Sequence, residues 1–268
     1  MLGRPIAHSL SPVLHRAAYA ALGLDGWSYQ AIDCGTGELP GLVAGCGPDW
    51  AGLSLTMPLK QAVLPLLAWT DPVAGATGGA NTVVFTGAGP HGYNTDVAGL
   101  VTALAEAGVR PGAATVLGAG ATACSALAAL RELGLAEVTV AVRDQARAGG
   151  LLSVAERLGV RVSLGTFGKV TEGLDLLLST VPRGGADAWA DGLRGLRQPP
   201  RAVLDVVYDP WPTPLAAAAS AAGSVLVGGF EMLLHQAARQ VELMTGRDAP
   251  VAQMRQAGLA ELSRRGRS

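Results

Sequence analysis

The sequence has too few cysteines and histidines for a disulfide framework or a zinc site. Its three cysteines, Cys34, Cys46 and Cys124, are odd in number and lack the spacing of metal ligands. We therefore expect reduced thiols and a cytoplasmic protein. The four histidines are scattered, and no two of them are four positions apart. The sequence thus predicts no bound metal.

The chain also has no excess of positive charge and no long run of bulky apolar residues. Twenty basic residues face 21 acidic ones, whereas a surface for nucleic acid or an anionic membrane needs a basic excess. Three long stretches without charge, 72–95, 111–130 and 210–230, are dominated by Gly, Ala, Pro, Ser and Thr. We expect no transmembrane span among them, and no signal peptide at the N-terminus. The expected partner is a small molecule.

What remains is the composition of a globular α/β protein. The 268 residues, 49% of them hydrophobic and 15% charged, suit two domains of ~100–150 residues each. Strand-like apolar runs alternate with helical patterns, which predicts mainly parallel sheets. Ser11 and Pro12 predict the N-cap and first turn of a helix that Gly23 ends. Strands are expected at 27–32, 51–56, 81–85, 92–95, 114–117, 137–142, 160–163, 174–180, 202–207 and 224–227, and helices at 39–44, 61–67, 97–107, 151–158, 214–222, 231–245 and 251–264.

A glycine-rich turn follows the strand at 114–117. Residues 118–123 read G-x-G-x-x-A and lead into a helix that Gly134 ends. The first glycine permits the tight turn, the second lets a pyrophosphate approach the backbone, and the helix N-terminus attracts phosphates. The pattern favours a dinucleotide site, although a tight turn without a ligand would have the same sequence.

The next strand, 138–142, bears on the choice of dinucleotide. Arg143 and Arg147 follow it, at a spacing that lets both guanidinium groups face one phosphate. This favours NADP, because an arginine at this place accommodates the 2′-phosphate. Asp144, which stands between them, keeps NAD open, and a solvated charged loop is the other interpretation.

Charged side chains are sparse in the first third of the chain. Between Trp50 and Ala105 only Lys60, Asp71 and Asp96 carry a formal charge. Asp71 precedes a proline and indicates a turn. Lys60 and Asp96 each follow a predicted strand, where open α/β sheets bind ligands, and together they could form an acid/base pair. An exposed lysine at a helix start and an aspartate N-cap are the alternatives.

Ser9 and Ser11 present a similar choice. Two hydroxyl groups at a helix N-terminus could bind a substrate carboxylate, or they could simply cap the helix. Neither neighbouring histidine, His8 or His15, is expected to be catalytic.

Taken in order, these residues and several further motifs resemble the shikimate dehydrogenase family over nearly the whole chain. The motifs are HSLSP at 8–12, TMPLK at 56–60, GANT at 79–82, YNTD at 93–96, the turn at 118–123, DVVY at 205–208 followed by Pro210 and TPL at 213–215, and GFEML at 229–233 leading to Gln236.

The resemblance implies a two-domain oxidoreductase. Its expected reaction is the NADP-linked interconversion of 3-dehydroshikimate and shikimate in aromatic amino-acid biosynthesis. Residues 1–97 and 230–268 would form an α/β substrate domain completed by C-terminal helices. Residues 98–229 would form an inserted Rossmann domain, with a doubly wound parallel sheet. A monomer and a homodimer both remain open.

Matching motif by motif, the resemblance also assigns the site. Lys60 and Asp96 would be the catalytic pair, and Ser9 and Ser11 would bind the substrate carboxylate. The full substrate set is Ser9, Ser11, Thr56, Lys60, Asn81, Asp96, Tyr208 and Gln236. The cofactor set is Gly118, Ala119, Gly120, Ala121, Thr122, Arg143, Arg147, Val206 and Gly229.

Two other functions remain open at this point. One is an NAD-dependent quinate or quinate/shikimate dehydrogenase, which Asp144 keeps in consideration. The other is a catalytically silent paralogue that binds NADP or shikimate, although the presence of both Lys60 and Asp96 argues against it.

Overall fold

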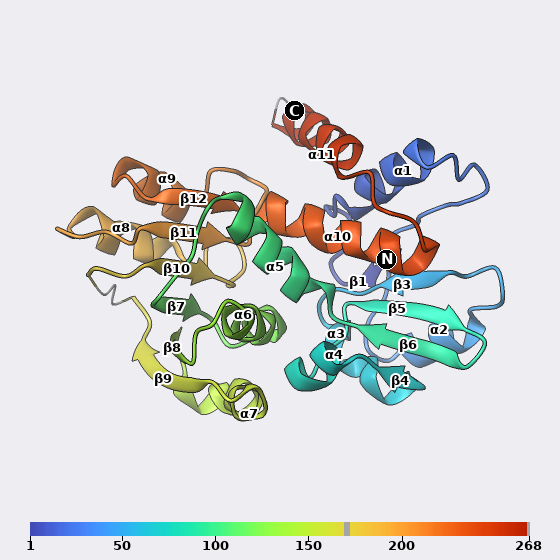
Figure 1. Ribbon diagram of the computed structural model, residues 1–268, viewed down its shortest axis with the longest axis horizontal. Helices are drawn as coiled ribbons and strands as arrows, with labels where there is room; N and C mark the ends of the chain where they lie inside the picture. Colours follow the sequence, from blue (N-terminus) through green and yellow to red (C-terminus); the bar gives the residue numbers. More distant parts are fainter. Residues whose placement is uncertain (169–171, 267–268) are drawn as a thin grey trace. The chain divides into compact units, whose positions relative to one another are not determined.

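A computed structural model describes residues 1–168 and 172–266 (Figure 1). The chain forms two compact units. Unit 1 comprises Met1–Gly99 and Leu233–Ser268, and unit 2 comprises Leu100–Met232. The chain leaves unit 1 within helix α5 (Thr95–Glu106) and returns to it within helix α10 (Gly229–Thr245). Within the described residues, no helix is both long enough and apolar enough to cross a bilayer.

Unit 1 is built around a four-stranded sheet in the order β3-β5-β6-β4. A short parallel pair, β1 with β2, lies beside it, and Leu2 of β1 bridges to Leu55 next to β3. The strands are β1 (Leu2–Gly3), β2 (Ile32–Asp33), β3 (Gly52–Ser54), β4 (Trp69–Thr70), β5 (Thr82–Thr86) and β6 (Gly89–Tyr93). The helices, besides parts of α5 and α10, are α1 (Ser11–Ala21), α2 (Leu39–Gly45), α3 (Leu59–Ala62), the 3-10 turn η1 (Leu64–Leu66), α4 (Pro72–Thr77) and α11 (Val251–Arg265).

The centre of this sheet is antiparallel, so the parallel pairing predicted for most of the sheet structure does not hold here. β5 pairs antiparallel with both β3 and β6. Only two residues, Gly87 and Ala88, join β5 to β6, and so short a connection allows a hairpin but no parallel crossover. The core beneath contains Leu2, Leu39, Leu53, Leu59 and Val83, none of them more than 2% exposed.

Unit 2 is the predicted doubly wound domain. Its six strands are all parallel, in the order β12-β11-β10-β7-β8-β9. The order reverses between β7 and β10, and ligands bind at such a switch point in open α/β sheets. The elements are β7 (Ala114–Leu117), α6 (Ala121–Glu132), β8 (Glu137–Val142), the 3-10 turn η2 (Gln145–Ala148), α7 (Gly149–Leu158), β9 (Arg161–Thr166), β10 (Leu176–Ser179), α8 (Asp187–Arg194), β11 (Ala202–Asp205), α9 (Pro214–Ala221) and β12 (Val225–Gly228).

Several local predictions need correction. Leu10, not Ser11, is the N-cap of α1, and Ser11 is the first helical residue. The helix expected at 61–67 is divided into α3 and η1, because Pro65 cannot continue an α-helical ladder. The strand expected at 27–32 is confined to Ile32–Asp33. Helix α8 is absent from the elements expected above, since its only strong signal is the apolar stripe of Trp189, Ala190 and Leu193.

Gly229, at the start of α10, lies against the end of β11. A Cβ atom at this position would lie 2.1 Å from the carbonyl oxygen of Val206 and 2.9 Å from that of Asp205. Neither contact is with a side chain that could turn away. The sequence therefore needs glycine here for a close backbone approach.

We expect Gly229→Ala to destabilise unit 2 by about 1–3 kcal/mol, because the added methyl group must displace the backbone of Val206. Gly150→Ala is the matched control. Gly150 lies in α7 with nothing within 4 Å of the added atom, so alanine should be neutral or stabilise by about 0.5–1 kcal/mol. Urea unfolding would measure both, and equal stabilities for the two variants would contradict the prediction.

Candidate active site

Two of the three charged residues between Trp50 and Ala105 form an ion pair in unit 1. Lys60 belongs to α3, which follows β3, and Asp96 belongs to the first turn of α5. Lys60 Nζ lies 2.5 Å from Asp96 Oδ2, and the two side chains are only 14% and 5% exposed. A nearly buried pair at this distance can hold an ammonium group in place for proton transfer.

Asn81 connects this pair to the rest of the unit. It directly precedes β5, and the register Thr82↔Tyr93 places it beside the residues that follow β6. Asn81 Nδ2 donates to Asp96 Oδ1 at 2.8 Å and to Thr95 Oγ1 at 2.9 Å. Its Oδ1 accepts from the backbone N of Thr95 at 2.8 Å and from Thr82 Oγ1 at 2.9 Å. The carboxylate of Asp96 is thus oriented by both Lys60 and Asn81.

Gln236 of α10 completes the polar cluster. Its Oε1 accepts from Asn81 Nδ2 at 3.3 Å, and its Nε2 donates to the backbone oxygen of Leu233 at 2.9 Å. The structure therefore brings together four of the residues selected from the sequence: Lys60, Asn81, Asp96 and Gln236.

The other substrate residues predicted in unit 1, Ser9, Ser11 and Thr56, make hydrogen bonds outside this cluster. Ser9 Oγ accepts from the backbone N of Ser11 at 3.2 Å, and Ser11 is buried. Thr56 follows β3, and its backbone N donates to the oxygen of Leu2 at 2.9 Å. Among the described residues, neither serine nor Thr56 hydrogen-bonds to Lys60 or Asp96.

A second set of selected residues surrounds the glycine-rich turn of unit 2. Gly118 has φ +105°, and a Cβ there would lie 2.9 Å from Thr180 Oγ1, so glycine is needed. Gly120 is the N-cap of α6, has no side-chain cap, and faces open space. The first N–H groups of α6 are therefore available to an anion, and no Cβ fills the space before them. Ala119, Ala121 and Thr122 lie along this turn, half-buried.

The loop after β8 carries the two arginines. Arg143 and Arg147 are both exposed, and the guanidinium carbon of Arg143 lies 6.0 Å from the centre of the Phe167 ring. Asp144 caps η2, because its carboxylate accepts from the backbone N of Ala146 at 3.0 Å. The aspartate thus has a structural role of its own, and the residues at this turn and loop fit a phosphorylated dinucleotide.

Val206 and Tyr208 belong to the segment between β11 and α9 in unit 2. Asp205 ties both ends of this segment: it accepts from Thr213 Oγ1 at 2.7 Å and from the backbone N of Val207 at 3.3 Å. Burial raises the pKa of Asp205, and these hydrogen bonds oppose the shift. The sequence analysis includes Asp205 only as part of the DVVY motif and gives it no role of its own. The signal that could have identified it is an acidic residue at the end of the apolar strand AVLD.

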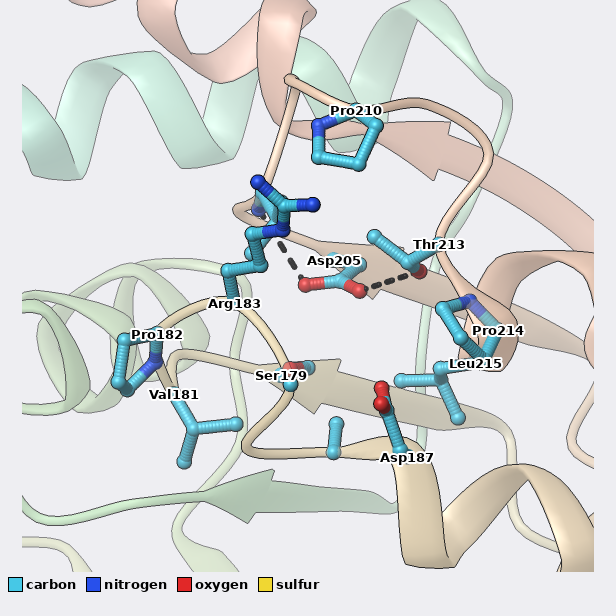
Figure 2. Close-up of a pocket in the computed structure, with 13 residues that line it drawn as sticks. Ser179, Val181, Pro182, Arg183, Asp187, Asp205, Pro210, Thr213, Pro214 and Leu215 are labelled. Atoms are coloured by element: carbon cyan, nitrogen blue, oxygen red, sulfur yellow. Dashed lines mark hydrogen bonds between the residues drawn. The ribbon is translucent and has the colours of Figure 1, made fainter. Parts of the chain in front are cut away.

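Asp205 and Thr213 also line a cavity of about 240 Å³ at the ends of β10 and β11. Figure 2 shows the Asp205 carboxylate at the centre of the residues drawn, hydrogen-bonded to Thr213, with Ser179, Arg183 and Asp187 around it. Gly229 makes the close approach to Val206 described above. Val206 and Gly229, which the sequence predicts to bind the cofactor, therefore lie in close backbone contact with each other.

The fold and these two sites define a class of protein: a Rossmann-type dinucleotide domain joined to a domain that carries a buried Lys–Asp pair. A model of the shikimate dehydrogenase substrate-binding domain matches residues 1–83, and a model of the shikimate 5′-dehydrogenase C-terminal domain matches residues 229–257.

Full-length relatives extend this match. Shikimate dehydrogenase (NADP(+)) of Halobacterium salinarum is 39% identical over 98% of each chain. The crystal structure of Mycobacterium tuberculosis shikimate dehydrogenase is 44% identical over 97% of each chain, with a TM-score of 0.88. The Thermus thermophilus enzyme, solved in complex with NADP(H) and shikimate, is 35% identical over 97% of each chain, with a TM-score of 0.83. The chain belongs to the shikimate dehydrogenase family, which confirms the resemblance inferred from its motifs.

Behind the cluster lies a buried histidine with consequences for stability. His15 is fully buried, its Nε2 lies 3.2 Å from Gln240 Oε1, and its ring stacks on Tyr29. Burial lowers the pKa of His15 to about 3, and the hydrogen bond to Gln240 only partly opposes this. The folded protein therefore holds His15 neutral at pH values where the unfolded chain protonates it.

We expect this histidine to make the protein less stable in mild acid. An unfolded histidine titrates near pH 6.5, so its contribution to stability is complete above that pH and is lost as the pH falls toward 3. Between pH 7.5 and 5, the wild type should lose about 2 kcal/mol more than His15→Phe. Urea unfolding at both pH values measures this, with His8→Phe at an exposed position as the control. Equal pH dependence in the wild type and His15→Phe would contradict it.

Proposed function

We propose that the protein is an NADP-dependent shikimate dehydrogenase that interconverts 3-dehydroshikimate and shikimate in aromatic amino-acid biosynthesis, in the cytoplasm. The observation that carries the proposal is the Lys60–Asp96 pair, which is nearly buried and braced by Asn81. Family membership supports the substrate class, and the relatives that use or bind NADP support the cofactor.

In this proposal one unit binds the substrate and the other binds the cofactor. Residues 1–97 and 230–268 bind the substrate, and residues 98–229 bind NADP. Gly118, Gly120 and the start of α6 take the pyrophosphate, since Gly120 leaves the helix N-terminus open. Arg143 and Arg147 take the 2′-phosphate, because both are exposed at the end of β8.

Lys60 is the proton-transfer group. Oxidation of the substrate alcohol breaks a C–H and an O–H bond; the hydride leaves with the electron pair, and the proton passes to a base. Lys60 Nζ takes or returns that proton at the substrate oxygen, and Asp96 holds the Nζ in place at 2.5 Å. When bound, the nicotinamide cofactor supplies the acceptor or donor of the hydride.

The other unit 1 residues orient the substrate. Asn81 and Gln236 belong to the same hydrogen-bonded cluster as Asp96, and together with Thr56 they bind ring hydroxyls. Ser9 and Ser11 bind the carboxylate near the start of α1. Tyr208, between β11 and α9, and the backbone at Val206 and Gly229 complete the substrate and cofactor sites.

The test is reduction of the cofactor, followed by absorbance of the reduced nicotinamide. Purified protein is given shikimate or quinate, each with NADP⁺ or with NAD⁺. Fast reduction of NADP⁺ with shikimate is expected, since the Asp144 carboxylate is engaged by Ala146 while Arg143 and Arg147 are exposed. A preference for NAD⁺ or quinate would point to the quinate/shikimate alternative, and no reduction in any cuvette would overturn the proposal in favour of a silent binding protein.

We further predict that Lys60→Ala lowers kcat at least ~10²-fold while changing the Kd for NADP⁺ little, because only the proton-transfer group is lost. Gln61→Ala is the matched control, since Gln61 is the exposed neighbour on the same helix and should keep wild-type kcat. Steady-state kinetics and cofactor titration measure both effects. A kcat for Lys60→Ala equal to that of the control would contradict the role of Lys60.

A further inference from the structure

Gln240 of α10 is a buried amide whose four hydrogen bonds are all made within unit 1. It is 2% exposed. Its Oε1 accepts from Ser54 Oγ at 2.8 Å and pairs with His15 Nε2 at 3.2 Å. Its Nε2 donates to Thr82 Oγ1 at 2.9 Å and to the backbone oxygen of Asn81 at 3.3 Å. A reversed amide would place its oxygen against the backbone oxygen of Asn81, which can only accept a hydrogen bond, so the orientation of the side chain is fixed.

This fixed orientation decides where the hydroxyl proton of Thr82 goes. A threonine hydroxyl has one proton to donate. Because Gln240 Nε2 occupies the acceptor side of Thr82 Oγ1, that proton is directed to Asn81 Oδ1, at 2.9 Å. The oxygen end of the Asn81 amide is thereby held toward Thr82 and Thr95, and its Nδ2 is held toward Asp96 Oδ1.

Successive hydrogen bonds therefore all donate in the same direction, from the buried interior toward the Lys60–Asp96 ion pair. This series begins at His15, passes through Gln240, Thr82 and Asn81, and ends on the Asp96 carboxylate that also holds Lys60. None of the three connecting residues carries a charge, so the chain orients groups and transfers no net charge.

We propose that Gln240 is a positioning residue for the Lys60–Asp96 pair, acting through Thr82 and Asn81. The inference rests on the proposed function, since the pair it positions is the proposed proton-transfer site. Gln240 touches neither member of the pair; it fixes the rotamer of the amide that orients Asp96.

The experiment compares Gln240→Glu and Gln240→Leu with the wild type. Gln240→Glu keeps acceptor atoms for Ser54 and His15 but offers a carboxylate oxygen to Thr82, which draws the hydroxyl proton away from Asn81. Gln240→Leu removes the amide without adding a charge, and so serves if the buried carboxylate prevents folding. Each variant should lower kcat about tenfold, the size expected for one misdirected hydrogen bond, with the KM for NADP⁺ unchanged.

A second comparison separates positioning from a loss of packing. In a Thr82→Val background the connection to Asn81 is already broken, so adding either Gln240 substitution should lower kcat no further. Gln253→Glu and Gln253→Leu, at an exposed position of α11, are the controls and should match the wild type. Folding is checked by circular dichroism and thermal unfolding. Wild-type kcat in both Gln240 variants, or effects that multiply with Thr82→Val, would overturn the proposal.

A readout independent of turnover keeps this test distinct from that of the proposed function. The backbone N–H of Thr95 donates to Asn81 Oδ1, so release of the Asn81 amide should speed its hydrogen exchange about tenfold, as measured by NMR. If the wild type is inactive on every substrate, the proposed function fails, and faster Thr95 exchange in Gln240→Glu but not in Gln253→Glu still supports the positioning role. Unchanged Thr95 exchange would reject that role.

Discussion

The antiparallel pairing of β5 with β6 is the constraint on which the unit 1 site depends. It joins Thr82 to Tyr93 across the hairpin, so the residue before β5 and the residues after β6 meet at one end of the sheet. Asn81, Thr95 and Asp96 are brought into hydrogen-bond contact in this way. Because the hairpin turn has only two residues, the register of the two strands is fixed, and the positions of the site residues at the end of the strands are fixed with it.

A buried ion pair is expensive unless its remaining hydrogen-bonding groups are satisfied. Here Asp96 uses one carboxylate oxygen for Lys60 and the other for Asn81. Behind Asn81, neutral groups continue inward to a histidine that burial keeps uncharged. The arrangement places the formal charges of the cluster at its outer end, where the Lys60 side chain keeps partial contact with solvent.

In unit 2 the main constraint is the close approach of backbone segments to one another. Gly118 and Gly229 each lie where a Cβ would collide with a neighbouring segment. Asp205 holds the loop between β11 and α9 by hydrogen bonds at both ends. Close approach of backbone segments and the hydrogen bonds of Asp205 therefore shape the ends of the central strands, and the two arginines after β8 are exposed.

Much of this could be predicted from the sequence because the signals are local. The strand–glycine turn–helix at 114–132 follows from short-range sterics, and the scarcity of charge around Lys60 and Asp96 singles them out as candidates for function. The pairing of β3 and β4 with the β5–β6 hairpin and the contacts of Gln240 could not be predicted in this way. Those depend on which strands pair and on which side chains far apart in the sequence come within hydrogen-bond distance, as Asn81 and Gln236 do. Such contacts have no local signature, and only the tertiary structure decided them.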